Sequence, residues 1–63
     1  MLQVSFNKIQ KSSILSNSRR LKEIASDLEL TSAYLYGHPE EEQKLMTAAL
    51  DLRIIAEELE NME

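Results

Sequence analysis

Isoleucine and leucine recur at every seventh position in two blocks of the chain, which the segment Gly37-His38-Pro39 separates. The first block is Ile14, Leu21, Leu28 and Leu35, and the second is Leu45, Leu52 and Leu59. A seven-residue apolar repeat keeps one stripe of a helix turned toward a partner helix. Two such stripes joined by a short turn predict two antiparallel helices packed against each other.

Local signals place the turn at residues 37–39. Gly37 readily takes the positive φ that often closes a helix. The φ of Pro39 is preset for a first helical turn, where no backbone N–H is needed. The run Glu40–Glu42 follows at the end of a helix where the dipole favours negative charge. These signals coincide with the gap between the two leucine blocks, so they predict a helix boundary there.

The expected fold is all-α, an antiparallel two-helix hairpin that dimerisation or a partner chain completes. A single helical-hairpin domain (1–63) is divided into an N-terminal lead (1–12), a first helix (13–36), a turn (37–39) and a second helix (40–61). Two starts remain open for the first helix, Ser12-Ser13 and Ser16-Asn17-Ser18, because serine side chains satisfy free backbone N–H groups. Residues 2–7 alternate between apolar and polar, which fits a strand as well as a helix through Leu2, Phe6 and Ile9.

Large apolar side chains are expected to form the seam between the two helices. The predicted seam residues are Leu21, Ile24, Leu28, Leu35, Leu45, Leu52, Ile55 and Leu59. Asn17 and Thr31 interrupt this stripe where an apolar residue is expected, which costs stability and can fix the register. Alanines beside the stripe, such as Ala49 and Ala56, allow the helices to approach closely.

The chain holds more apolar residues than one seam needs. Burying a leucine or isoleucine side chain is worth roughly 1.5–3 kcal/mol, so several left in water forfeit much of a small domain's stability. Either the N-terminal segment covers them, or they receive a partner helix or a second copy of the chain, and we favour the second interpretation. The predicted partner-binding residues are Leu30, Tyr34, Met46, Leu50 and Ile54.

Composition limits how this chain gains stability. A domain of 63 residues is marginal alone, and chains of this size often rely on disulfides, metals or oligomerisation. There is no cysteine and only one histidine, so neither a disulfide nor a metal or other cofactor is expected. Association with another protein chain, as a homo-oligomer or a hetero-oligomer, is the remaining reinforcement.

Charge is unevenly distributed along the chain. Residues 1–36 carry five basic and three acidic side chains, whereas residues 40–63 carry two basic and eight acidic ones. Because nucleic-acid binders neutralise phosphates with basic residues, the acidic second half argues against a nucleic-acid partner. No apolar run is long enough to cross a membrane, and no secretory signal is evident at the start. The absence of cysteine fits the cytoplasmic location that we expect.

No group of residues suggests catalysis or metal binding. His38 is the one side chain suited to acid–base chemistry near neutral pH, but no serine or aspartate is placed to form a triad with it. The carboxylates of Glu40–Glu42 point in different directions on a helix, so they do not converge on a cation. We therefore expect a non-enzymatic protein with no catalytic residues.

Residues 21–35 resemble the helix-turn-helix of repressor families. The matching positions are Ile24, Ala25, Leu28, Leu30 and Leu35. Glu29 stands where those families often have glycine, and residues 31–36 lack the Lys, Arg, Asn or Gln side chains that contact base edges. This resemblance implies an alternative function, a small transcriptional regulator that contacts DNA through residues 20–36.

The whole chain resembles the small helical-hairpin chaperone subunits of type III secretion systems. The similarity lies in the length, the short lead, two helices of similar size and a glycine-containing turn. In addition, the apolar pattern of that family's second helix is similar to Ala49-Leu50 followed by Ile54-Ile55. The resemblance implies a cytoplasmic hairpin that works with a second chaperone and keeps a needle subunit from polymerising. We therefore expect a small chaperone or adaptor that buries a partner's amphipathic segment.

Overall fold

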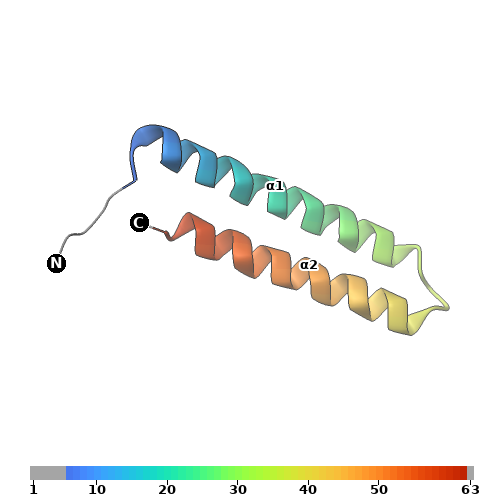
Figure 1. The fold of residues 1–63 in the computed structure, drawn as a ribbon. Coiled ribbons are helices and arrows are strands. Elements are labelled where there is room, and N and C mark those ends of the chain that lie inside the picture. Colours follow the sequence, from blue (N-terminus) through green and yellow to red (C-terminus); the bar gives the residue numbers. More distant parts are fainter. Residues whose placement is uncertain (1–5, 63) are drawn as a thin grey trace.

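The computed structural model describes residues 6–62 as two long α-helices, α1 (Lys8–Ala33) and α2 (Pro39–Glu60). The helices run side by side in opposite directions and are joined at one end by a short turn, so that Lys8 and Glu60 lie at the same end of the molecule (Figure 1). Within the described residues there is no strand. The predicted all-α antiparallel hairpin is therefore confirmed.

The first helix begins at Lys8 instead of residue 13, because Asn7 and Gln10 cap it reciprocally. The Asn7 carboxamide oxygen accepts the Gln10 backbone N–H at 2.8 Å, and the Gln10 side-chain oxygen accepts the Asn7 N–H at 2.9 Å. This capping box satisfies two N–H groups that a helix start leaves unpaired. Both serine-rich starts considered from the sequence are therefore wrong, and those serines lie inside α1.

The prediction of an N-terminal lead is wrong from residue 8 onward, since α1 already includes that part of the chain. Phe6 and Asn7 belong to neither a helix nor a strand, and Phe6 is half-buried. Leu2 and Val4 lie outside the described residues, as does most of the alternating segment 2–7. The choice between a strand and a helix for that segment is therefore not addressed by the structure.

The chain reverses direction over residues 34–38. The first helix ends at Ala33 instead of residue 36, and the Tyr34 N–H donates to the Thr31 carbonyl at 3.0 Å. Gly37 has a φ of 94°, which L-residues with a side chain rarely adopt. Pro39 then opens α2, which ends at Glu60, within one residue of the predicted bounds at both ends. Pro39 therefore has the role that the sequence predicts for it, whereas Gly37 takes the predicted positive φ within the turn and does not close the first helix, which has Tyr34 as its C-cap.

Replacing Gly37 with alanine tests the turn. A Cβ at Gly37 meets no atom within 4 Å, so the cost is conformational and not steric crowding by neighbours. We expect Gly37→Ala to lower the free energy of unfolding by about 1–2 kcal/mol, since a positive φ is strained for L-residues. Gly37→Asn is expected to cost less, because asparagine tolerates this region better. Urea denaturation followed by circular dichroism measures both, and an unchanged midpoint for Gly37→Ala would contradict the assignment.

Small side chains, and not leucines, fill the space between the helices. The fully buried residues of the described chain are Ser18, Ala25 and Ser32 on α1 and Ala49 and Ala56 on α2, spaced seven residues apart on each helix. Small residues at the contact allow two helix backbones to approach closely. We call this set the small-residue seam.

The predicted seam of large apolar residues is therefore wrong in its details. Ile24 and Ile55 are 47% and 45% exposed, and the predicted leucines are only half-buried. Asn17 and Thr31 are exposed and do not interrupt the seam, because the adjacent Ser18 and Ser32 occupy it instead. The seven-residue period was correctly recognised, but the face in contact is rotated toward the small residues.

A buried hydrogen bond fixes how the two helices align. The Ser18 hydroxyl donates to the Ala56 carbonyl oxygen of α2 at 3.1 Å. Seven residues after Ser18 on α1 is Ala25, and seven residues before Ala56 on α2 is Ala49. This register places the two alanines at the same level, and neither is exposed to solvent. The second buried hydroxyl, that of Ser32, donates to the Glu29 carbonyl of its own helix at 2.7 Å. Both buried serines are thus satisfied, as a polar group in a seam must be.

Enlarging a seam residue tests the close approach of the helices. We expect Ala25→Leu to destabilise the hairpin by about 1–3 kcal/mol, because the added side chain has no space between the backbones. Ala33→Leu is the matched control, since Ala33 lies on the same helix and is exposed. Thermal unfolding measured by circular dichroism compares the two variants with the wild type. Equal stability of both variants would show that the seam is not tightly packed.

Candidate functional site

The leucines that repeat every seven residues on both helices lie to one side of the small-residue seam. At about 100° per residue, the positions four before and three after a seam residue fall on the same side of it. Leu21 and Leu28 bracket Ala25 in this way, and Leu45 and Leu52 bracket Ala49. In an antiparallel pair the two rows face the same direction, so they form one continuous surface. We call it the leucine flank, and it consists of Leu21, Ile24, Leu28, Leu35, Leu45, Leu52, Ile55 and Leu59.

Ion pairs occupy the opposite flank. The Arg53 guanidinium donates to both carboxylate oxygens of Glu29, at 2.7 and 3.2 Å, and to the Ser26 hydroxyl at 3.2 Å. Nearer the chain ends, the Lys22 ammonium nitrogen lies 2.6 Å from a Glu60 carboxylate oxygen. Each pair joins α1 to α2 across the seam. This ion-pair flank therefore connects the helices on one side while the leucine flank stays open.

The ion pairs shift the pKa values of their carboxylates. The hydrogen bond from Arg53 lowers the pKa of Glu29 below its ordinary value, and Glu29 in turn raises the pKa of Arg53. The hydrogen bond from Lys22 lowers the pKa of Glu60 in the same way. All these groups lie at the surface, where such pairs contribute little to stability. Because each pair joins one residue of α1 to one residue of α2, both pairs are compatible with this alignment of the helices.

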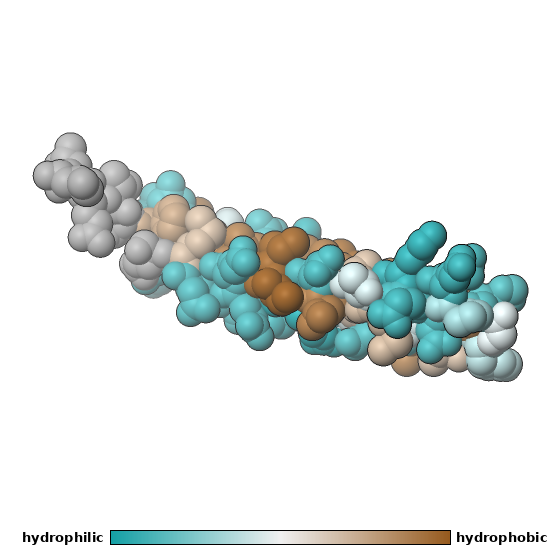
Figure 2. All heavy atoms as spheres, turned by 90° about the horizontal axis from the view of Figure 1, so that it is seen from below, coloured by the Kyte–Doolittle hydropathy of each residue, from teal (hydrophilic) through white to brown (hydrophobic). Residues whose placement is uncertain are grey.

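Three of the predicted partner-binding residues form one row on the outside of α2. Met46 and Leu50 line a shallow groove beside Arg53, and Ile54 follows Leu50 by one helical turn. All three are exposed, Leu50 by 59%. Seen from the α2 side, apolar side chains gather in the middle of the molecule with hydrophilic side chains around them (Figure 2). We call Met46, Leu50 and Ile54 the outer row.

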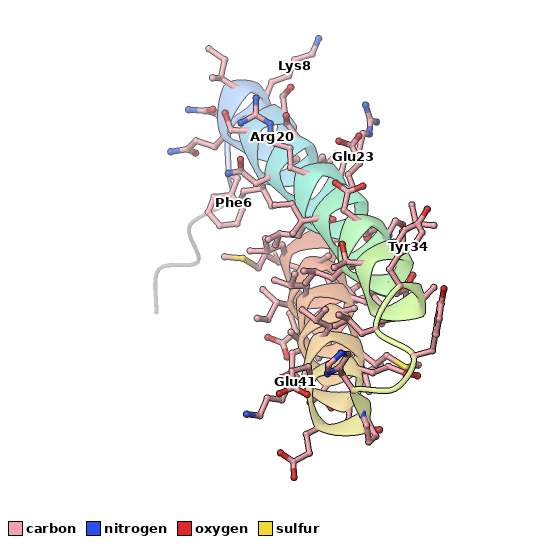
Figure 3. All side chains as sticks on the ribbon, turned by 90° about the vertical axis from the view of Figure 1, so that its right-hand side faces the viewer. Phe6, Lys8, Arg20, Glu23, Tyr34 and Glu41 are labelled. Atoms are coloured by element: carbon pink, nitrogen blue, oxygen red, sulfur yellow. The ribbon has the colours of Figure 1, made fainter. Side chains whose placement is uncertain are left out.

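The other two predicted residues lie elsewhere. Leu30 and Tyr34 are exposed on the side of α1 that faces away from α2, and Tyr34 is 79% exposed. In the view along the hairpin, Tyr34 points away from α2 (Figure 3). The structure therefore does not bring Leu30 and Tyr34 together with the outer row. Whether any of these residues binds a partner stays a prediction.

Sequence reasoning missed the leucine flank because it assigned the leucines to the helix contact. The missed signal is a second row of small residues with the same seven-residue period, Ser18, Ala25 and Ser32. When small and large residues alternate at spacings of three and four, the small row allows the closer contact. The large row then lies beside the contact, where two helices alone leave it half-exposed.

The turn that a helix-turn-helix requires near Glu29 is not formed. The first helix continues without interruption from Lys8 to Ala33, and the Thr31 hydroxyl donates to the Asp27 carbonyl one turn earlier, at 3.0 Å. Glu29 is paired with Arg53 of α2 within this regular helix. The resemblance of residues 21–35 to that motif therefore does not extend to its geometry.

No metal site is found in the part of the chain that the structure describes. His38 is exposed at the turn, and residues 6–62 contain no group of three potential ligands that lie close enough to hold a metal ion. Neither helix of this range has the length and apolarity that a bilayer crossing demands. No protein-family model, curated protein or solved structure significantly matches the chain.

Acidification tests the ion-pair flank. Because the pKa values of Glu29 and Glu60 are lowered in the folded state, their stabilising effect is present above the ordinary glutamate value of 4.5 and is lost as pH falls through the lower folded values. We expect Glu29→Gln to lower the melting temperature at neutral pH but not at strongly acidic pH, where wild type and variant converge.

Melting curves across this pH range provide the measurement. Glu23→Gln is the matched control, because Glu23 is an exposed glutamate of α1 that points away from α2 (Figure 3). A destabilisation by Glu29→Gln that persists unchanged at low pH would argue against the ion pair as its cause.

Proposed function

We propose that this protein is a non-enzymatic interaction module, a small chaperone or adaptor that buries the apolar face of a partner's amphipathic helix on its leucine flank. The observation that carries this proposal is the absence of any buried large apolar side chain within residues 6–62. The hairpin buries only alanine and serine completely, while its leucines and isoleucines remain partly in water. A partner helix on this flank supplies the burial that two helices alone do not.

The shape and length of the leucine flank suit a helix as its partner. The flank runs along both helices, and α2 alone has 22 residues, or about 33 Å at 1.5 Å per residue. Its leucines repeat with the helical period, so a second amphipathic helix packs against them with matching ridges and grooves. The resemblance to type III secretion chaperones points to the same kind of partner. That resemblance, like the expected cytoplasmic location, stays a prediction.

Charge indicates which amphipathic helices are favoured. The second helix carries seven acidic and two basic side chains. Of these, Glu41, Lys44 and Asp51 lie along the α2 edge of the leucine flank, judged from helical spacing. A partner helix with basic edges is therefore favoured over an acidic one of equal apolarity.

Two designed peptides test the proposal. Both carry the same leucine stripe, one with lysine and the other with glutamate on the polar face. We expect the lysine peptide to bind at least about tenfold more tightly, a difference that one or two favourable charge contacts supply. Fluorescence anisotropy of labelled peptide, with dilute protein and at two salt concentrations, measures the affinities.

Two aspartate variants separate apolar docking from simple charge attraction. Ile55→Asp places a carboxylate on the leucine flank and is expected to weaken binding of the lysine peptide, although it makes the protein more acidic. Leu30→Asp adds the same charge on the far side of α1 and is expected to leave binding intact. Failure of both peptides to bind to the monomeric protein, or equal binding by Ile55→Asp and wild type, would overturn the proposal. A third variant, Leu50→Asp, places the same charge on the outer row, and loss of binding in this variant alone would move the site there.

A further inference from the structure

We infer that the leucine flank is covered by a second copy of this chain, so that two hairpins form an antiparallel four-helix bundle with α1 of each copy on α2 of the other. The inference rests on the proposed function, because it names the partner of the same surface. Three observations carry it: the charge of the two helices, the order of charges along the edges of the flank, and the size of the flank.

The hairpin presents a basic helix beside an acidic one. The first helix has five basic and three acidic side chains, while α2 has two basic and seven acidic ones. A half-turn about an axis parallel to the helices places α1 of one copy on α2 of the other and matches these opposite charges. A half-turn about an axis across the helices would instead place acidic α2 on acidic α2. Electrostatic complementarity favours the first arrangement, in which all neighbouring helices are antiparallel.

Individual charges at the edges of the flank also match. On the α1 edge, helical spacing places Arg20 and Asp27 one heptad apart, and on the α2 edge it places Lys44 and Asp51 one heptad apart. The Ser18–Ala56 hydrogen bond fixes the level of each residue along the bundle, and rotation about a parallel axis preserves that level. Arg20 then lies one turn from Asp51 of the second copy, and Asp27 lies one turn from Lys44. Both pairs are opposite in charge.

The leucine flank has the size that a stable interface needs. Two helices side by side present a face about 20 Å wide and about 33 Å long. Treated as flat, this face has an area of roughly 650 Å², and the protruding side chains increase the area that is accessible to solvent. Stable protein interfaces bury about 800 Å² on each partner. On the opposite side Arg53 and Lys22 bridge the helices, and the exposed Met46 and Leu50 line a groove beside Arg53 on α2 instead of a face shared by both helices. A second copy with the same flank is thus a complementary partner in area, apolarity and charge.

Light scattering coupled to size-exclusion chromatography tests the inference. We expect the wild-type chain, whose mass is 7.2 kDa, to elute at micromolar concentration with the mass of a dimer. Ile55→Asp is expected to weaken dimerisation at least about a hundredfold, because an unpaired carboxylate is then buried in the interface. Leu30→Asp and Leu50→Asp carry the same charge outside the leucine flank and are expected to remain dimeric. Circular dichroism of Ile55→Asp confirms that a monomeric variant is still helical.

Charge exchange tests the arrangement without altering the apolar surface. Arg20→Asp is expected to weaken the dimer severalfold, and adding Asp51→Arg in the same chain is expected to restore it. If Asp27→Arg restores the dimer and Asp51→Arg does not, α1 lies on α1 and the proposed arrangement is overturned. A wild-type monomer that still binds the lysine peptide overturns the second copy as partner and leaves the proposed function standing. A monomer that binds neither peptide overturns both.

Discussion

The close approach of two helix backbones along Ser18, Ala25 and Ser32 is the constraint on which the rest of this structure depends. Small side chains on both sides of the contact leave no space between the helices for a leucine. The large apolar residues of the same heptads must therefore lie beside the contact. A hairpin built in this way gains a well-defined register from the Ser18–Ala56 hydrogen bond but does not enclose its own hydrophobic residues.

The two sides of the seam differ because of where the charges fall. Arg53 and Lys22 bridge the helices on one side through Glu29 and Glu60. The other side carries leucine and isoleucine at the positions that correspond by helical spacing. The hairpin is therefore amphipathic as a whole, in addition to the amphipathicity of each helix. The proposed binding of another helical surface rests on this arrangement.

The sequence was sufficient to predict the hairpin and its turn. The heptads of leucine establish two helices, and Gly37 and Pro39 locate the reversal, because the conformational preferences of these two residues are local. The start of α1 was missed, since the Asn7–Gln10 capping box competes with several serines that are equally suitable by residue type. Propensity alone does not rank such candidates.

The face in contact was missed for a different reason. Leucines and small residues share the same period on each helix, so periodicity does not distinguish which row touches the partner helix. The choice depends on the distance between the helices, a tertiary property that Ala25 and Ala49 decide jointly. For the same reason the candidate surface was only partly foreseen: the outer row is exposed as expected, while the larger leucine flank emerges only after the seam is known.

The bridging of one side by Arg53 and Lys22 has a consequence for assembly at high concentration. A hairpin with self-complementary surfaces on two sides adds copies without limit and grows into a filament. A hairpin with one such surface stops growing once that surface is covered by a second copy. In the dimer inferred above, Arg53 and Lys22 bridge the helices on the side that faces away from the second copy, so this side does not repeat the leucine flank.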